Sequence, residues 1–330
     1  MKHMLGRGIE PIMLSRVAES LFWMSRYLER AENVARLLDI GLYLELDAGN
    51  TFVDDGSAPV EIALTILSCR EAFRSTHPTA ERTAVLGFLT FDRTNPQSIL
   101  SMIARARENA RGTQETIGVD AWSQVNRLYL YLGSQRAQRR FHSSPSGFYT
   151  TIKQSCILFD GLIQNTLPRD EVYHFLRLGR YLERVDVVGR ILHAKCQSLP
   201  GGEGGSEAGQ ELVRWTGLLR SCSAYGAYLR TERDRVEPVG VIRFLVLDPD
   251  FPRAIRFCVA RCRESLREIA GGDEDEFVTE AERLLGRLES ELRYIDVGEI
   301  FERGLLPFLI SIQTTCRRVG EEIQRTFFLV

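Results

Sequence analysis

A thirteen-residue segment occurs twice in this chain, and this repeat constrains the fold more than any other feature of the sequence. Residues 26–38 read RYLERAENVARLL and residues 180–192 read RYLERVDVVGRIL, with eight of the thirteen aligned positions identical. Average composition alone would make roughly one of thirteen positions match. The sequence therefore indicates an internal duplication.

A second pair of segments repeats in the same order. Residues 88–108 and 244–264 share an initial Phe-Leu, then an aspartate, a proline and an isoleucine, and a final Ala-Arg-x-Arg-Glu. The two pairs are offset by 154 and 156 residues, a period too long for a solenoid of short units. We predict a single unit over residues 1–330 made of two intertwined repeats, the first about 13–150 and the second about 167–330.

The repeated segments have the spacing of amphipathic helices. Apolar residues from Leu21 to Leu38 form a continuous stripe along a helix expected from Ser15 to about Leu44. Prolines are sparse, at 11 in 330 residues, and few runs alternate as a strand does. The segments 276–294 and 300–328 also show helical spacing. The sequence predicts an all-α helical bundle of about ten helices, built from two pseudo-symmetric repeats of about 155 residues.

Charge and hydropathy narrow the classes of function. Lysine plus arginine number 42 and aspartate plus glutamate 44, whereas nucleic-acid-binding proteins usually carry a clear basic excess. No run reaches the roughly 18 apolar residues of a membrane span. The first sixteen residues lack the apolar stretch of a signal peptide. We expect no nucleic-acid or membrane partner and a cytoplasmic location.

The spacing of potential ligands does not predict a metal site. Seven cysteines, an odd number without a C-x-x-C pair, indicate neither a disulfide framework nor a zinc site. Helical di-iron proteins combine Glu-x-x-His motifs with further carboxylates. Glu171 and His174 have that spacing, but twelve residues of helix would place Glu171 roughly 18 Å from Glu183. We expect no metal and no cofactor.

The candidate site residues are the acid-base dyads of the repeated helix. Packing of the two copies about a pseudo-twofold axis predicts that Glu29 meets Arg184 while Glu183 meets Arg30. The expected network adds Tyr27 and Tyr181 from the same helices and Arg107, Glu108, Arg263 and Glu264 from the second repeated segment.

Two interpretations of these charges remain open. In the structural one, the dyads pair across helices and specify the geometry of the seam. Glu32 with Arg36 and Asp186 with Arg190 are then local i,i+4 pairs on an exposed helix surface. In the other interpretation, some of these arginines stay open and bind a carboxylate or phosphate, which a planar guanidinium does bidentately.

The sequence also resembles a known family. Residues 13–39 (MLSRVAESLFWMSRYLERAENVARLLD) look like the opening of the bacterial alpha-E family, helical proteins named for an E-R motif, and NPQSI at 95–99, ARENAR at 106–111 and DEVYHFLRLGRYLERVD at 170–186 agree with it. Such domains are typically encoded beside, or fused to, circularly permuted ATP-grasp ligase-like proteins and transglutaminase-like cysteine peptidases. The resemblance implies these partners and a role in peptide or amide-bond metabolism.

Two functions follow from these observations. The chain has no P-loop, G-x-G-x-x-G, H-E-x-x-H or G-x-S-x-G motif. The leading hypothesis is a non-catalytic helical accessory or binding module that acts with an ATP-grasp-type ligase or a transglutaminase-like peptidase. The alternative is an enzyme of peptide or amide metabolism with an Arg/Glu-lined pocket between the repeats. There Arg30 or Arg184 would orient an anionic substrate, and Glu29 or Glu183 would serve as acid or base.

Overall fold

The computed structural model describes residues 13–47, 59–197, 208–232, 235–271 and 277–329. In these ranges the chain forms 17 α-helices, two π-helical segments and no strand, which confirms the all-α prediction. The number of helices exceeds the ten expected, because segments expected to form one long helix are divided into shorter ones. The segment 300–328 belongs to α16 (Val297–Arg303), α17 (Leu305–Ile323) and η3 (Gln324–Phe328). Gly304, with a φ of 86°, separates α16 from α17.

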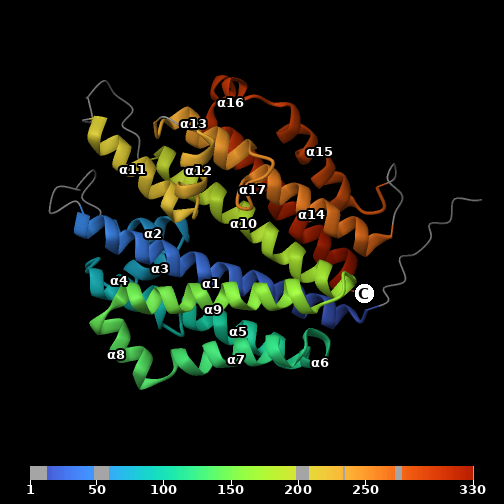
Figure 1. Cartoon of the computed structure of the whole chain (residues 1–330), viewed down its shortest axis with the longest axis horizontal. Helices are drawn as coiled ribbons and strands as arrows, with labels where there is room; N and C mark the ends of the chain where they lie inside the picture. The colour runs from blue at the N-terminus through green and yellow to red at the C-terminus, as the bar shows by residue number, and fades with distance from the viewer. Residues whose placement is uncertain (1–12, 48–58, 198–207, 233–234, 272–276, 330) are drawn as a thin grey trace, which may run out of the picture.

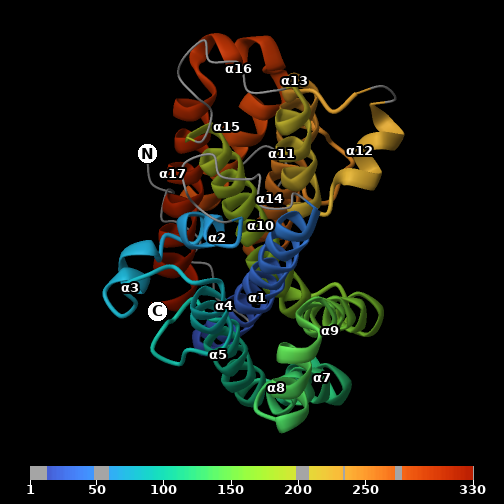
Figure 2. The ribbon, with the colours of Figure 1, turned by 90° about the vertical axis from the view of Figure 1, so that its left-hand side faces the viewer.

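Two long helices form the centre of the molecule and carry the repeated segment. They are α1 (Ser15–Asp47) and α10 (Glu171–Gln197), and they pack against each other where the two halves of the chain meet (Figures 1 and 2). The apolar stripe predicted on α1 is buried, with Leu21, Met24 and Leu38 fully enclosed. The amphipathic pattern therefore places α1 correctly in the core.

Each central helix packs mainly against helices of its own half of the sequence. Figure 2 shows α5, α7, α8 and α9 on one side of α1, and α11, α14, α15 and α17 on the side of α10. Helix α1 packs against α5 and α9, and α10 packs against α14 and α17. This order is what a duplication would produce, and superposition of two equivalent repeats stays a prediction.

The first-half helices are α2 (Ile62–Ile66), α3 (Arg70–Arg74), α4 (Arg82–Thr90), α5 (Ile99–Gly112), α6 (Gln114–Ile117), α7 (Val119–Leu132), α8 (Gln135–Ser143) and α9 (Pro145–Thr166). The remaining second-half elements are α11 (Ala208–Ser221), α12 (Tyr225–Thr231), α13 (Pro238–Ile242), η2 (Arg243–Leu247), α14 (Ile255–Ala270) and α15 (Glu280–Tyr294).

A glycine permits the closest approach of the two central helices. A Cβ atom on Gly179 of α10 would collide with the carbonyl oxygen of Phe22 on α1 and lie 3.1 Å from its carbonyl carbon. Only a residue without a side chain fits there. On the other side of α10, Gly189 faces the Gln313 side chain of α17, 3.3 Å from where a Cβ would lie. Gly179 therefore sets how closely α10 approaches α1, whereas at Gly189 the neighbouring atoms belong to a flexible side chain.

All seven cysteines are free, and six of them are buried, as expected of small apolar side chains. Across the described ranges, no helix combines the length and apolarity that a bilayer span requires. Residues 1–12, on which the expectation about a signal peptide mainly depends, lie outside those ranges.

Candidate functional site

The seam between α1 and α10 contains both crossed ion pairs that the sequence predicts. Arg184 donates from Nε and Nη2 to the two carboxylate oxygens of Glu29, at 2.9 and 3.1 Å. Arg30 donates from Nε and Nη2 to those of Glu183, at 2.6 and 2.8 Å. Both pairs are bidentate, the geometry in which a guanidinium fixes the orientation of a carboxylate most strongly. The surroundings of the two pairs nevertheless differ.

The Glu29 pair is enclosed by an arginine from a distant part of the chain. Arg253, between η2 and α14, donates to Glu29 at 2.9 Å and to Glu32 at 2.8 Å. Arg36 also donates to Glu32. Glu32 and Arg36 are only 3% and 4% exposed. The predicted i,i+4 pair between them therefore forms, but its predicted place on an exposed helix surface is wrong, because the segment before α14 covers this face of α1.

Helix α9 completes the enclosure. Asp160 accepts a hydrogen bond from Arg180 of α10 at 2.8 Å and lies 3.6 Å from Arg184. Lys153, also on α9, pairs with Asp39 of α1 at 2.5 Å. These acids and bases tie α9 across both central helices. We call the set Glu29, Glu32, Arg36, Asp160, Arg180, Arg184 and Arg253 the closed cluster.

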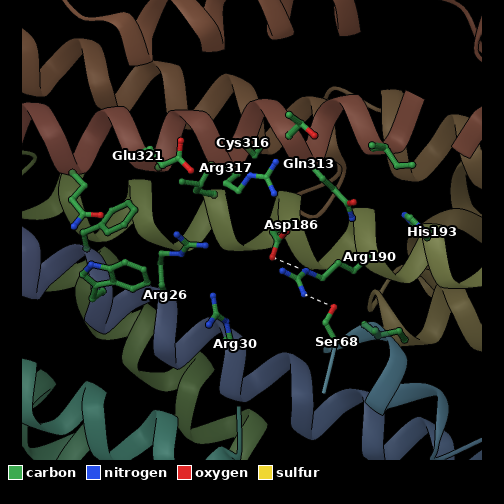
Figure 3. A pocket seen from close by; sticks show the side chains of 18 of the residues that line it. Arg26, Arg30, Ser68, Asp186, Arg190, His193, Gln313, Cys316, Arg317 and Glu321 are labelled. Carbon is green, nitrogen blue, oxygen red and sulfur yellow. Dashed lines mark hydrogen bonds and ion pairs between the residues drawn. The ribbon is translucent and has the colours of Figure 1, made fainter. Parts of the chain in front are cut away.

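The Glu183 pair, in contrast, borders an open pocket. Glu183 itself is 2% exposed and accepts a further hydrogen bond from Arg26 Nε at 2.9 Å. Arg26 and Arg30 line a pocket of about 770 Å³ between α1, α10 and α17. Figure 3 shows both guanidinium groups directed into this space.

We call this space the arginine pocket. Its charged lining consists of Arg26 and Arg30 from α1, Asp186 and Arg190 from α10, and Arg317 and Glu321 from α17. Asp186 accepts from Arg190 at 2.9 Å, and Arg190 reaches Ser68 after α2 at 3.3 Å. Four arginines thus face two acids, so the pocket is suited to an anionic group.

The pKa values of the carboxylates at the seam are shifted in opposite directions. Burial would raise the pKa of Glu183, but the charges of Arg30 and Arg26 outweigh it and lower the pKa to about 2. Burial alone would raise the pKa of Glu29, but the charges of Arg184 and Arg253 lower it far below its usual range. Burial raises the pKa of Asp186, and the Arg190 charge only partly offsets this effect. Glu29 and Glu183 are therefore ionised at neutral pH, whereas burial of Asp186 favours its protonated form.

Acidification is expected to weaken the fold through the crossed pairs. The pKa of Glu183 is depressed from 4.5 to about 2, so its contribution to stability is complete above pH 4.5 and is lost as the pH falls toward 2. Glu29 acts in the same direction, and Asp186, whose pKa is raised, acts in the opposite one. Urea unfolding at several values between pH 7 and pH 2 should show stability falling from about pH 4.5 downward. A Glu183→Gln variant should show a shallower fall, and an equally steep one would contradict this assignment.

The two predicted tyrosines lie in different places. The Tyr181 ring lies under the guanidinium carbons of Arg180 and Arg184, at 4.9 and 5.4 Å from its centroid, and so borders the closed cluster. Tyr27 stacks on Trp23 at 5.6 Å and lines a second groove, between α1 and α5. It does not close the network of ion pairs, because its position on α1 faces α5.

The four candidates from the second repeated segment lie away from both crossed pairs. Arg107 bonds to Asn126 of α7 at 2.8 Å, and Glu108 pairs with Arg111 at 2.7 Å. In the second half, Arg263 pairs with Glu289 of α15 at 2.7 Å, and Glu264 with Arg177 of α10 at 2.8 Å. Arg107, Arg263 and Glu264 thus make helix-helix contacts within one half, and Glu108 makes a surface pair.

Several residues of the seam were not singled out by sequence reasoning, although a signal existed for some. Residues 145–166 of α9 align with 305–326 at an offset of 160, with six identical positions that include Cys156 and Cys316. In this alignment Asp160 corresponds to Gly320, and Lys153 to Gln313. Arg26 and Arg180 are the first residues of the two RYLER segments. Nothing in the pattern around Arg253 indicates its contact with α1.

Among the residues that the structure describes, no group of three or more His, Cys, Asp or Glu side chains is placed to hold a metal ion. Glu171 and Glu183 lie on one helix, α10, as the spacing argument assumed. The chemistry of the seam therefore rests on guanidinium and carboxylate groups.

The chain is similar to proteins from mycobacteria. An uncharacterized protein of Mycobacterium bovis is 22% identical over 344 residues, which cover 97% of this chain and 38% of the relative. Uncharacterized proteins of two Mycobacterium tuberculosis strains match at 22% and 21% over the same share. The chain thus spans well under half the length of these relatives, and no solved structure matches it. The Alpha-E family model, described as a predicted alpha-helical domain with a conserved ER motif, matches residues 13–328. Since that match covers nearly every residue, the chain belongs to the Alpha-E family.

Proposed function

We propose that this chain is a helical accessory and binding module that holds an anionic group of its ligand in the arginine pocket. The observation that carries the proposal is the position of Arg26 and Arg30. Both are fixed by the buried Glu183, and both face the pocket. A guanidinium whose orientation is already set loses little freedom on binding, which favours recognition of an anion.

The accessory role is supported by the relatives. The region that matches this chain makes up 38% of the mycobacterial proteins, so there it is one part of a longer polypeptide. A module of this kind would act beside a separate domain that carries out the catalysis. From the family resemblance, we propose that the partner is a circularly permuted ATP-grasp-type ligase or a transglutaminase-like peptidase. The shared process would be peptide or amide-bond metabolism.

An enzyme remains the second candidate, with a different acid from those expected. Glu29 is enclosed in the closed cluster, and Glu183 is buried and ionised. Neither is placed to exchange a proton with a ligand. Asp186 lines the pocket, and burial raises its pKa. Perturbed carboxyl groups in a pocket are typical of acid-base sites, so an enzymatic role would rest on Asp186.

Association with the partner tests the proposed function. The tagged chain should copurify with the ligase or peptidase proposed as its partner, and the partner's turnover should fall when the chain is omitted. Arg30→Gln should reduce that turnover, whereas Arg111→Gln, an exposed residue of α5 far from the pocket, should not. No association, with full partner activity in the absence of the chain, would contradict the accessory role. Product formation by the chain alone that Asp186→Asn abolishes would instead favour the enzyme.

A further inference from the structure

The arginine pocket exists where the second half lacks groups that close the first half. On α9, Asp160 pairs with Arg180 and Lys153 pairs with Asp39. The aligned positions of α17 are Gly320 and Gln313, which both line the pocket. No carboxylate from α17 therefore occupies the position opposite Arg26 that Asp160 occupies opposite Arg180.

The geometry at Gly320 shows how near this position is to the arginines. A Cβ built on Gly320 would lie 3.9 Å from Arg26 Nη1 and 3.9 Å from Leu182, so a side chain fits there. Glu183 engages Nε of Arg26 and the Nε and Nη2 of Arg30. Within the described part of the chain, the Nη groups of Arg26 and the Nη1 of Arg30 are left to face the pocket.

We propose, building on the binding function above, that a carboxylate of a small peptide-like ligand binds between Arg26 and Arg30. It takes the position that corresponds to the Asp160 carboxylate in the other half. The ligand thereby completes in the second half an arrangement of charges that the first half completes with its own side chain.

The charge of the pocket favours a carboxylate over a phosphate. Four arginines line it, and three acids face them when the buried Glu183 is included with Asp186 and Glu321. One carboxylate balances the remaining positive charge, whereas a phosphate monoester carries about −1.5 to −2 charges at neutral pH. A carboxylate also has the planar pair of oxygens that matches a guanidinium edge.

The rest of the pocket fits a peptide-like body. At about 770 Å³, the space is larger than a single carboxylate needs and lies in the range of small-molecule sites. Gln313, Thr314 and Gln324 of the lining offer neutral donors and acceptors for amide groups. Phe22, Trp23 and Leu182 supply apolar surface beside them.

Calorimetric titration of the full chain with three probes tests the inference. The probes are the dipeptide alanyl-glutamate, alanyl-glutaminamide, which keeps the ammonium group but lacks both carboxylates, and inorganic phosphate. We expect alanyl-glutamate to bind at least tenfold more tightly than either of the others. Gly320→Asp should weaken its binding at least tenfold, because the new carboxylate would occupy the site itself. Gly161→Asp, which adds the same charge at a helical glycine of α9 with open space around it, should leave binding unchanged.

Arg30→Gln provides an independent variant, since Glu183 keeps its hydrogen bond from Arg26, and it should also weaken binding at least tenfold. Tighter binding of phosphate, or no binding of any probe, would overturn the inference of a carboxylate ligand. Equal losses in Gly161→Asp and Gly320→Asp would overturn its location. Each of these results leaves the copurification test standing, so failure of the inference and failure of the proposed function are distinguishable.

Discussion

Glutamine in place of Glu29 is expected to lower the free energy of unfolding by about 3–5 kcal/mol, the usual range for breaking a buried ion pair. The substitution keeps the size of the side chain, so it creates no cavity. It removes the charge that Arg184 holds at 2.9 Å and Arg253 at 2.9 Å. Both side chains are only 11% exposed, and water cannot replace the lost carboxylate without opening the seam.

Urea unfolding at pH 7 measures this effect, and Glu108→Gln is the matched control. Glu108 also pairs with two arginines, Arg107 and Arg111, but its side chain is 50% exposed. An exposed pair of this kind contributes about 0–1 kcal/mol. A loss below about 1 kcal/mol for Glu29→Gln would mean that the closed cluster is accessible to water, contrary to its burial.

The sequence predicted the crossing of the two pairs because the repeat itself contains the information. Two identical Glu-Arg dyads on packed copies of one helix have few ways to pair, and reciprocal pairing satisfies both. The helical class and the extent of α1 follow from apolar periodicity in the same way. Local patterns thus fix these features well.

The difference between the closed cluster and the arginine pocket could not be predicted in this way. Arg253 is 224 residues from Glu29 in the sequence, and no periodicity connects them. The pocket depends on a missing carboxylate, because Gly320 stands at the position that aligns with Asp160. A search for identical residues does not detect such a position, since the two residues differ. The burial of Glu32 and Arg36 was mispredicted for the same reason, since their i,i+4 spacing is equally compatible with an exposed or a covered surface.

The two RYLER segments have different surroundings, although their sequences are nearly identical. In the first half, Asp160 and Lys153 add ion pairs that link α9 to the central helices. In the second half, Gly320 and Gln313 leave α17 without these links and leave two arginines facing a cavity. Differences at two aligned positions, 160 with 320 and 153 with 313, thus accompany the difference between the closed cluster and the arginine pocket.

Alanine in place of Gly179 is expected to destabilise the protein by about 3 kcal/mol or more, the upper range for overpacking. The added methyl group would collide with the carbonyl oxygen of Phe22, and that oxygen belongs to the backbone of α1. Backbone cannot rotate aside as a side chain can, so the helices would have to separate along the seam. Both crossed pairs span this seam, and their bidentate geometry would be strained as a result.

Gly161→Ala on α9 is the matched control, because nothing lies within 4 Å of a Cβ at that position. Alanine there should be neutral or should stabilise the helix by up to about 1 kcal/mol. Thermal and urea unfolding of both variants measure the difference. A small effect of Gly179→Ala would show that α1 and α10 can move apart at little cost. The orientation of Arg26 and Arg30 would then not be fixed before a ligand binds, and the physical basis for a preorganised anion pocket would be lost.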